Sequence, residues 1–300
     1  MDIKSKLAPL VGELFTNGKG SGMSRAVSKK ERAAREFREN LQVYQCPICS
    51  SAFLAKEGGI QCGSGHFFNL ARKGYLNLLM GAPSTHYSKD LFSARKNAFA
   101  HGIYDPLVDQ VAALVVASGL QRPYGVDAGC GEGSFLARIQ RHLAGARLIG
   151  IDISRDGIQL ASTHEQPIMW CVADLAELPL AAGSMDIVFN ILSPANYDEF
   201  RRVLKPDGIL IKVLPGEEYL REIRLQLEGI HSYSNQEVVA KLRENLEIQR
   251  HVHLRYQVPL SMELWQLVIE MTPLTWHRQP GAVPPSDLTL DLELIEARCV

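Results

Sequence analysis

Three cysteines and one histidine in the first quarter of the chain have the spacing of a metal site. Their pattern is C-x2-C-x12-C-x3-H, formed by Cys46, Cys49, Cys62 and His66. Two cysteines in a single tight turn can reach one ion, and the second pair completes a tetrahedron of the thiolate and imidazole ligands that Zn2+ prefers. Four protein ligands leave no position for water, so we expect a structural zinc site. The competing interpretation is a set of buried cysteines beside an unrelated histidine.

A glycine-rich segment further along has the composition of a cofactor-binding loop. Between a predicted strand and a predicted helix it runs Asp127-Ala128-Gly129-Cys130-Gly131-Glu132-Gly133, where the main chain can turn sharply and approach a ligand closely. A nicotinamide-binding fingerprint would have its third glycine at the position of Ser134. The carboxylate of Asp127 would repel a pyrophosphate, but it suits S-adenosylmethionine, which carries a sulfonium and an ammonium and no phosphate. The loop therefore predicts a site for S-adenosylmethionine.

Two further aspartates each follow a predicted strand. Asp152 ends the segment 147–152, where it can accept hydrogen bonds from ribose hydroxyls. Asp174 follows the segment 168–172, where it can accept from an adenine amino group. Open α/β sheets bind ligands beyond the carboxyl ends of their strands, which is where these acids and Asp127 fall. Any one of them alone could be a helix cap or a turn residue, but three together favour a cofactor site.

The loop after the next predicted strand carries polar residues that suit recognition of a substrate. Asn190, Ser193, Asn196 and Tyr197 can hydrogen-bond to a base or stack on it, and Pro194 stiffens the loop between them. The alternative is that Ser193 or Asn196 caps a helix beginning near 197. Both interpretations can hold together.

These residues need a sheet that brings strand ends together. From about residue 107, helical stretches alternate with apolar strands, which is typical of a parallel sheet with crossover helices. We predict an α/β fold with the Rossmann-like sheet of class I S-adenosylmethionine-dependent methyltransferases. The predicted strands are 124–128, 147–152, 168–172, 185–191, 208–214, 249–257 and 287–298. The predicted helices are 105–119, 133–143, 155–164, 196–203, 216–228, 235–244 and 260–271.

Composition divides the chain into four segments. Residues 1–40 join a Gly/Ser-rich gap to a charged helical run, and we expect a partly disordered extension, either an RNA-tethering arm or a plain addition. Residues 41–80 form a small zinc-binding module that is too short to fold on apolar burial alone. Residues 81–105 are a connector containing a helix, and 106–300 form the methyltransferase domain.

Charge is unevenly distributed along the chain. The net charge is −1, yet residues 1–105 hold 15 Lys and Arg against 8 Asp and Glu, while residues 106–300 hold 17 against 25. A basic front half indicates contact with a polyanion, although chance clustering on a solvated surface gives the same count. No run of eighteen apolar residues predicts a membrane span, and the N-terminus lacks an apolar signal core. We therefore expect a cytoplasmic protein without a membrane contact.

Several motifs together resemble one family. They are Cys46-Pro47-Ile48-Cys49, Cys62 with His66, Gly74-Tyr75-Leu76-Asn77-Leu78, Gly102-Ile103-Tyr104-Asp105-Pro106-Leu107, the glycine-rich segment 127–133 and Met271-Thr272-Pro273. Over roughly residues 42–300 the chain resembles the RlmA family of ribosomal RNA guanine-N1 methyltransferases. The segment Ser193–Leu204 with Gly208–Val213 is more similar to the second branch, RlmA(II), of which the TlrB-like proteins are members.

The resemblance implies a substrate and partners. The second branch modifies guanine 748 in hairpin 35 of 23S rRNA in Gram-positive bacteria, with a role in resistance to tylosin-type macrolides, and the first branch modifies the neighbouring guanine 745. It also implies a homodimer whose zinc modules help to bind the RNA. A methyltransferase of small molecules, or an RNA-binding protein that keeps a relic cofactor fold, are the rival interpretations; the zinc module and the acidic positions disfavour them.

The resemblance also adds residues to the cofactor site. It implies that Gly131 and Glu132 contact the cofactor and that Tyr104 packs near it. Tyr219 stands where the family shows a histidine, so its contact is an expectation on weaker grounds. No catalytic base is identified by the sequence. The full set of expected cofactor-binding residues is Tyr104, Asp127, Gly129, Gly131, Glu132, Gly133, Asp152, Ile153, Asp174, Leu175, Asn190 and Tyr219.

Overall fold

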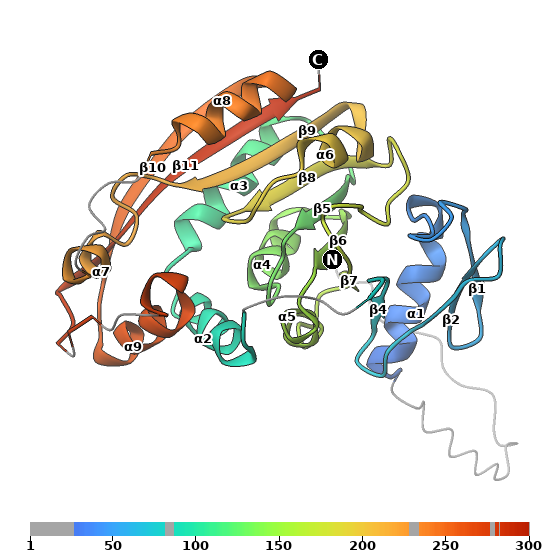
Figure 1. The fold of residues 1–300 in the computed structure, drawn as a ribbon, viewed down its shortest axis with the longest axis horizontal. Coiled ribbons are helices and arrows are strands. Elements are labelled where there is room, and N and C mark those ends of the chain that lie inside the picture. The colour runs from blue at the N-terminus through green and yellow to red at the C-terminus, as the bar shows by residue number, and fades with distance from the viewer. Residues whose placement is uncertain (1–26, 82–86, 228–233, 277–279, 282, 300) are drawn as a thin grey trace, which may run out of the picture.

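One sheet of eight strands runs through the molecule (Figure 1). The computed structural model describes residues 27–81, 87–227, 234–276, 280–281 and 283–299. The strand order is β10-β11-β9-β8-β5-β6-β7-β4. Their bounds are β4 Tyr75–Asn77, β5 Tyr124–Ala128, β6 Arg147–Asp152, β7 Met169–Val172, β8 Met185–Ile191, β9 Leu204–Pro215, β10 Glu247–Pro259 and β11 Asp287–Arg298.

The strands from β4 to β9 are parallel, and their order reverses around β5. β5 pairs with β6 on one side and with β8 on the other, both in parallel register. The connections leaving β5 and β8 therefore diverge, and the divergence opens a crevice at the carboxyl ends of these strands. The side chains of the central strands are buried on both faces, as expected of a parallel sheet covered by helices.

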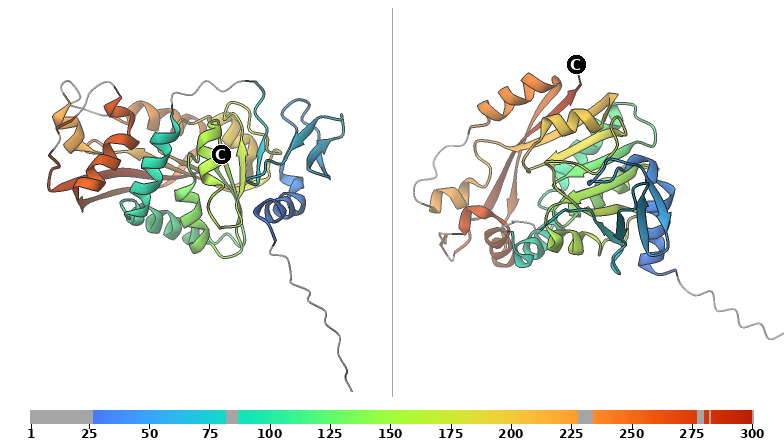
Figure 2. Two further views of the ribbon diagram at one scale, coloured as in Figure 1. Left: turned by 90° about the horizontal axis from the view of Figure 1, so that it is seen from below. Right: turned by 45° about the vertical axis from the view of Figure 1, so that its right-hand side comes forward.

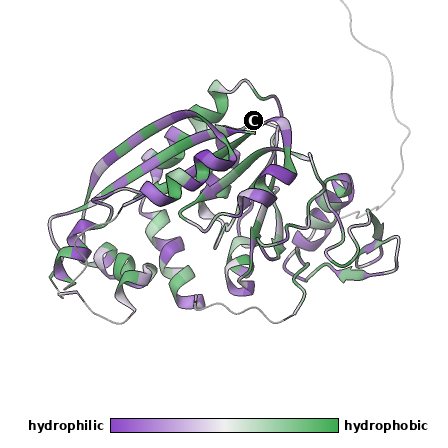
Figure 3. Cartoon of the chain, turned by 45° about the horizontal axis from the view of Figure 1, so that its top comes forward, coloured by the Kyte–Doolittle hydropathy of each residue, from purple (hydrophilic) through white to green (hydrophobic). Residues whose placement is uncertain are grey.

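The last two strands differ from the predicted parallel sheet. β11 runs antiparallel to β9 and to β10, so the expectation of a wholly parallel sheet is wrong at this edge. β10 alternates between exposed and half-buried residues, and Figure 3 shows the matching alternation of purple and green along the long strands. The period-2 pattern of a strand identifies its buried face but not its direction, which explains the error.

Helices cover both faces of the sheet (Figures 1 and 2). The helices whose buried residues join the first of two core clusters are α2 Lys89–Ala100, α3 Asp105–Ala117, α4 Ser134–His142, α5 Arg155–Ala161, α7 Arg221–Gln226 and α9 Met262–Met271. Those that join the second cluster are α1 Lys29–Glu39, α6 Tyr197–Val203 and α8 Gln236–Asn245. Short 3-10 turns lie at Leu41–Val43 and Pro273–Thr275. Within the described ranges, no helix is long and apolar enough to cross a membrane.

A separate sheet of three short antiparallel strands lies beyond the β4 edge, coloured blue in Figure 1. Its strands are β1 Phe53–Lys56, β2 Gly59–Cys62 and β3 Phe67–Asn69. Lys56 pairs with Gly59 across a hairpin turn, in which Gly58 has φ +78°. The next strand, β4, already belongs to the large sheet, where it pairs with β7. The small sheet is thus a separate sheet that is joined to the large one by the short segment between β3 and β4.

Helix α1 lies between the small sheet and the edge of the large one (Figure 1). Ser28 begins it with a capping box in which its hydroxyl accepts from Glu31 N at 3.2 Å. Phe37 is only 2% exposed and packs against Tyr44, with ring centroids 5.7 Å apart. Lys29 Nζ donates to His164 O at 2.8 Å. The predicted helical run is therefore a folded element, while the rest of the expected extension, 1–26, lies outside the described residues.

This docking makes a prediction about stability. Replacing Phe37 by alanine should lower the free energy of unfolding by about 3 kcal/mol, the usual cost of emptying a buried phenylalanine site. The measurement is urea unfolding of the full chain, with Arg38→Ala on the exposed side of α1 as the matched control. Equal stability of the two variants would mean that α1 does not pack on the methyltransferase sheet in solution.

Candidate functional site

The small sheet brings the four predicted metal ligands together. Cys46 and Cys49 lie in the turn that precedes β1, Cys62 ends β2, and His66 precedes β3. Each offers one ligand atom, and the four atoms all lie within 4.8 Å of one another. The sulfur of Cys62 is 3.3 Å from Nδ1 of His66 and 3.6 Å from the sulfur of Cys49.

This donor set fits a structural zinc ion. Three sulfurs and one ring nitrogen are the ligands of closed tetrahedral zinc sites, and four of them leave no open position for a reacting water. Cys46 and Cys62 are buried, so their thiols face the cluster rather than solvent. Cross-linking by the ion supplies the stability that three short strands cannot reach by apolar burial.

A cavity of about 340 Å³ lies at the carboxyl ends of β5, β6, β7 and β8. We call it the acidic cavity, because four carboxylates line it. Its lining residues include Asp127, Glu132, Asp152 and Asp174. The remaining lining residues that the sequence predicted are Tyr104, Gly129, Ile153 and Leu175. The crevice expected at the reversal of strand order is therefore a real cavity.

The three glycines have different surroundings, although all have positive φ angles. Gly129 lines the acidic cavity, and a Cβ atom there would lie 2.7 Å from the side chain of Ser193. Gly133 lies behind the loop, where a Cβ atom would lie 2.5 Å from the Trp170 ring. Gly131 donates its N–H to Oδ2 of Asp152 at 2.8 Å. Gly131 and Gly133 thus shape the turn and are not lining residues of the cavity.

Two of the carboxylates carry oxygens without a partner. Asp127 and Glu132 are each 2% exposed, and among the described residues Oδ1 of Asp127 and Oε1 of Glu132 have no hydrogen-bond donor. Burial, with the nearby charges of Asp152 and Glu132, raises the pKa of Asp127 well above its usual range. Burial also raises the pKa of Glu132, against the opposing charge of Arg95. A cation with N–H donors would satisfy both oxygens, and S-adenosylmethionine supplies an ammonium and a sulfonium.

Asp152 is tied to the loop on both of its oxygens. Oδ2 accepts from Gly131 N at 2.8 Å, and Oδ1 accepts from Ser154 N at 2.7 Å. Burial raises the pKa of Asp152, and these two N–H groups oppose the shift. Ser154 in turn caps α5 by accepting from Gly157 N at 3.2 Å. The carboxylate is therefore fixed in one orientation at the end of β6.

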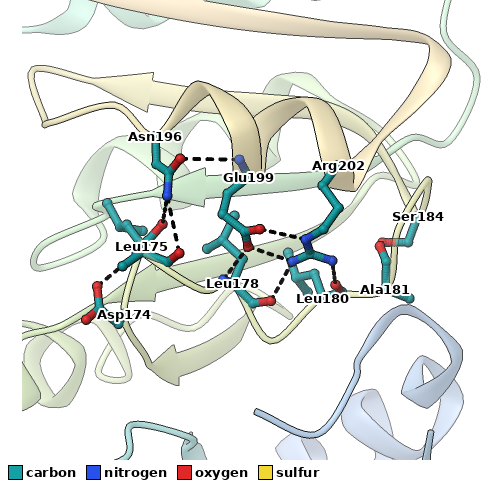
Figure 4. A network of polar contacts seen from close by, with 10 residues as sticks. Asp174, Leu175, Leu178, Leu180, Ala181, Ser184, Asn196, Glu199 and Arg202 are labelled. Carbon is teal, nitrogen blue, oxygen red and sulfur yellow. Dashed lines mark hydrogen bonds and ion pairs between the residues drawn. The ribbon is translucent and has the colours of Figure 1, made fainter. Parts of the chain in front are cut away.

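Helix α6 fixes the loop that carries Asp174 and Leu175 (Figure 4). Asn196 Nδ2 donates to Leu175 O at 3.1 Å, while its Oδ1 caps the helix by accepting from Glu199 N at 3.3 Å. Glu199 accepts from Leu178 N at 2.6 Å. Arg202 donates to the carbonyl of Leu178 at 2.8 Å and also pairs with Glu199. The predicted cap is thus correct for Asn196, and it also holds the cavity wall.

Asn190 lies behind the cavity and organises the loop after β8. It is fully buried, and its Nδ2 donates to Ala128 O and Pro194 O at 2.9 Å and to Ser193 Oγ at 2.6 Å. Its Oδ1 accepts from Nζ of Lys212, which also donates to Ser193 O at 2.7 Å. Asn190 does not itself line the acidic cavity. It joins the ends of β5, β8 and β9 into one rigid wall.

A second cavity of about 460 Å³ adjoins the first. We call it the basic cavity, because its charged lining residues, Arg95, Lys212 and Lys241, are all cations. The two cavities share five lining residues: Arg95, Tyr104, Leu192, Ser193 and Pro194. A donor in one cavity and an acceptor in the other would therefore meet at the loop after β8.

The two predicted tyrosines lie at the junction of the cavities. Tyr104 OH and Tyr219 OH are 2.6 Å apart, and burial raises the pKa of both hydroxyls. Tyr104 lines both cavities, whereas Tyr219 lines the basic cavity alone. Tyr219 was expected to contact the cofactor, but it lines the basic cavity and not the acidic one.

Sequence reasoning missed two cations of the site. Arg95 lines both cavities and donates to Met271 O at 3.2 Å. Lys212 lies near the carboxyl end of a buried strand. A signal for Lys212 was present, because it is a lone charge in the apolar run 208–214. No comparable signal marks Arg95.

The sheet, the glycine turn and the carboxylates at the strand ends define a class I S-adenosylmethionine-dependent methyltransferase that carries a zinc ribbon. Family models agree: "Methyltransferase domain" matches residues 126–212, and "RlmA, N-terminal" matches residues 44–83.

Two relatives extend over most of the chain. The protein "Putative 23S rRNA (guanine-N(1)-)-methyltransferase YxjB" of Bacillus subtilis is 38% identical over 273 residues, covering 85% of this chain and 97% of the relative. The 23S rRNA (guanine(748)-N(1))-methyltransferase of Streptomyces fradiae is 30% identical over 255 residues, covering 81% and 90%. The chain therefore belongs to the RlmA family of 23S rRNA (guanine-N1) methyltransferases.

The zinc cluster leads to a prediction about metal content. The double replacement Cys46→Ser and Cys49→Ser removes two of the four ligands, so bound zinc should fall from one ion per chain to none. Elemental analysis of purified protein measures this, with Cys299→Ser, outside the cluster, as the control. Calorimetry should find the affinity for S-adenosylmethionine changed by less than about threefold, since the acidic cavity lies on the other sheet. Retention of zinc by the double variant would refute the ligand assignment.

The contacts of Glu199 predict how stability depends on pH. Burial raises its pKa, but the Arg202 side chain and the Leu178 N–H lower it more, so the folded pKa lies below the ordinary value. A lowered folded pKa stabilises the protein fully above the unfolded pKa, about 4.3, and this stabilisation is lost as pH falls through the folded pKa. Replacing Glu199 by glutamine should cost about 2 kcal/mol at neutral pH, and the cost should shrink in increasingly acidic buffer.

Urea unfolding of the wild type and of Glu199→Gln across this acidic range measures the effect. Asp198→Asn is the matched control, because that neighbouring carboxylate is 86% exposed. A cost that stays constant as pH falls would contradict the charge-assisted contact.

Proposed function

We propose that this protein transfers the methyl group of S-adenosylmethionine to N1 of guanine 748 in hairpin 35 of 23S rRNA, in the cytoplasm and as a homodimer. The observation that carries the proposal is the pair of adjoining cavities, one lined by carboxylates and one by cations, in a chain that also carries a zinc ribbon. The named activity of the Streptomyces fradiae relative supports the guanine position. A contribution to tylosin-type macrolide resistance belongs to the same proposal.

The acidic cavity holds the donor in this proposal. Asp127 and Glu132 receive its cationic groups, Asp152 accepts from the ribose hydroxyls, and Asp174 accepts from the adenine amino group. Tyr104, Ile153 and Leu175 line the same space, and Gly129 lets the main chain approach the ligand. The bound cofactor supplies an electrophilic methyl group on a sulfonium. Three residues hold the cavity wall in place without lining it: Gly131, Gly133 and Asn190. Tyr219 contributes by its hydroxyl contact with Tyr104.

The basic cavity receives the target base. Guanine N1 carries a proton at neutral pH, so the nitrogen becomes nucleophilic only when this proton is removed. The base must also leave its stack, because the methyl group has to lie in line with N1. Tyr104, Tyr197 and Tyr219 line the cavity and offer rings for stacking. The two cavities share Leu192, Ser193 and Pro194 of the loop after β8, where the two reactants meet.

The front half of the chain positions the RNA. Lys30 and Arg38 of α1 line one surface hollow together with residues 55–60 of the zinc ribbon, where they can contact phosphates of a hairpin. The ribbon holds the RNA in this proposal, so the Cys46→Ser and Cys49→Ser variant loses RNA affinity while it keeps its cofactor.

Reverse transcription tests the activity directly, because a methyl group on N1 blocks base pairing. Extension on 23S rRNA should stop at guanine 748 when the gene is present in the cell and read through when it is deleted. Complementation with Asp152→Asn should lose at least about 90% of the stop, as expected when an oriented hydrogen bond to the donor is removed. Asp156→Asn, an exposed neighbour in α5, is the matched control and should restore the stop. A stop at guanine 745, or no stop, would refute the assigned position.

A further inference from the structure

Lys212 is a buried cation that has no counter-ion in the part of the chain that the structure describes. It lies near the carboxyl end of β9, is 2% exposed, and lines the basic cavity. Among the described residues it forms no ion pair; its acceptors are Ser193 O, at 2.7 Å, and Oδ1 of Asn190. An ammonium has three N–H bonds, so one of them remains for a ligand in the cavity. Burying a charge in this position costs free energy unless a partner of opposite charge or a set of hydrogen bonds compensates it.

Charge is separated between the two cavities. Four carboxylates line the acidic cavity, and no carboxylate is among the described residues that line the basic one. The ionisable groups that face the basic cavity besides Lys212 are Arg95 of α2, Tyr104, Tyr197, Tyr219 and Lys241 of α8. At neutral pH this wall is therefore positive, and it stabilises negative charge on whatever occupies the cavity.

The protonation of Lys212 fits that role. Burial lowers its pKa to about 8, so the side chain is mostly an ammonium at neutral pH and becomes an amine in alkaline solution. Asn190 and Ser193 hold it through acceptors only, which favours the charged form. The hydroxyl of Tyr197, also in this wall, is buried, has no hydrogen-bond partner among the described residues, and can donate to the same occupant.

We propose that Lys212 is a catalytic residue that donates a hydrogen bond to O6 of the target guanine and thereby stabilises the base with N1 deprotonated. This inference rests on the proposed function. Loss of the N1 proton places negative charge on N1 and O6 together, so a cation at O6 makes N1 easier to ionise. A group placed where charge develops costs no reorganisation during the reaction.

The step balances without a further reactant. The proton on N1 passes to water, and the N1 electron pair bonds to the methyl carbon of the donor. The electron pair of the broken carbon–sulfur bond stays on sulfur, which leaves neutral S-adenosylhomocysteine. Lys212 keeps its own protons throughout, so only its protonated form accelerates the step.

Single-turnover methylation of a hairpin by the wild type and by Lys212→Met tests the proposal across pH. At pH 7 the wild type should be about 100-fold faster, the usual effect of one donor to a developing oxyanion. By pH 9 the ratio should fall to about tenfold, because Lys212 loses its proton with a pKa of about 8. Lys205→Met, in the same strand but paired with Asp186 at 2.8 Å, is the control and should follow the wild type.

Each alternative gives a different curve. A ratio that rises with pH would make Lys212 a general base for the N1 proton, and a ratio independent of pH would make it a structural support of the loop; either result overturns the proposal. Failure of the wild type to methylate the hairpin at all would instead refute the proposed function.

A measurement without methyl transfer covers the case in which Lys212→Met folds poorly. A hairpin with 6-thioguanine at the target position reports ionisation of N1 by its ultraviolet absorbance. Bound to the cofactor-free wild type, this base should ionise at a pH at least one unit lower than in free RNA. Ionisation at the same pH in the bound and the free hairpin would refute the stabilisation of the deprotonated base.

Discussion

Everything in the methyltransferase site depends on negative charge buried at the strand ends. The carboxylates of Asp127 and Glu132 are buried away from water, and among the described residues one oxygen of each has no hydrogen-bond donor. Such groups destabilise a folded chain until a cation reaches them. In the proposed function this cost creates affinity for a sulfonium donor, and two main-chain N–H groups hold the nearby carboxylate of Asp152 in one orientation. The fold is thus incomplete in its polar interactions where its function lies.

Rigidity around these charges comes from polar contacts behind the walls. Asn190 connects three strand ends through one side chain, and Arg202 fixes the wall that carries Asp174. Neither side chain lines the acidic cavity. A charged ligand is bound best by fixed partners, because a mobile carboxylate would have to reorganise on binding and would lose much of its electrostatic stabilisation of the ligand. The supporting contacts therefore matter to binding although they touch no ligand.

Local pattern was sufficient to predict the bounds of several strands, and it was insufficient elsewhere. β5, β6 and β8 begin and end at the predicted residues, because glycine, proline or polar residues lie at or close to the ends of their apolar runs. The predicted helix at 216–228 is reduced to Arg221–Gln226, since Asp291 accepts from Glu218 N and binds the preceding turn to β11. That contact links residues 73 positions apart. The direction of a strand depends on similar contacts between distant residues, and so does the place of Arg95 in the lining of the cavities. No local pattern encodes such contacts.

The zinc ribbon and the sheet are mechanically one unit. β3 of the ribbon is followed within a few residues by β4, which is hydrogen-bonded to β7 of the large sheet. Gly74 at this junction has φ +85°, and a Cβ atom there would lie 2.9 Å from the side chain of Ala33 in α1. The close approach locks α1 against the junction, so the ribbon is not free to swing on a linker. If the ribbon binds the RNA as proposed, the RNA is presented to the cavities at a fixed distance and orientation. This geometry, in addition to contacts to the base, is then a physical means of selecting one guanine among its neighbours.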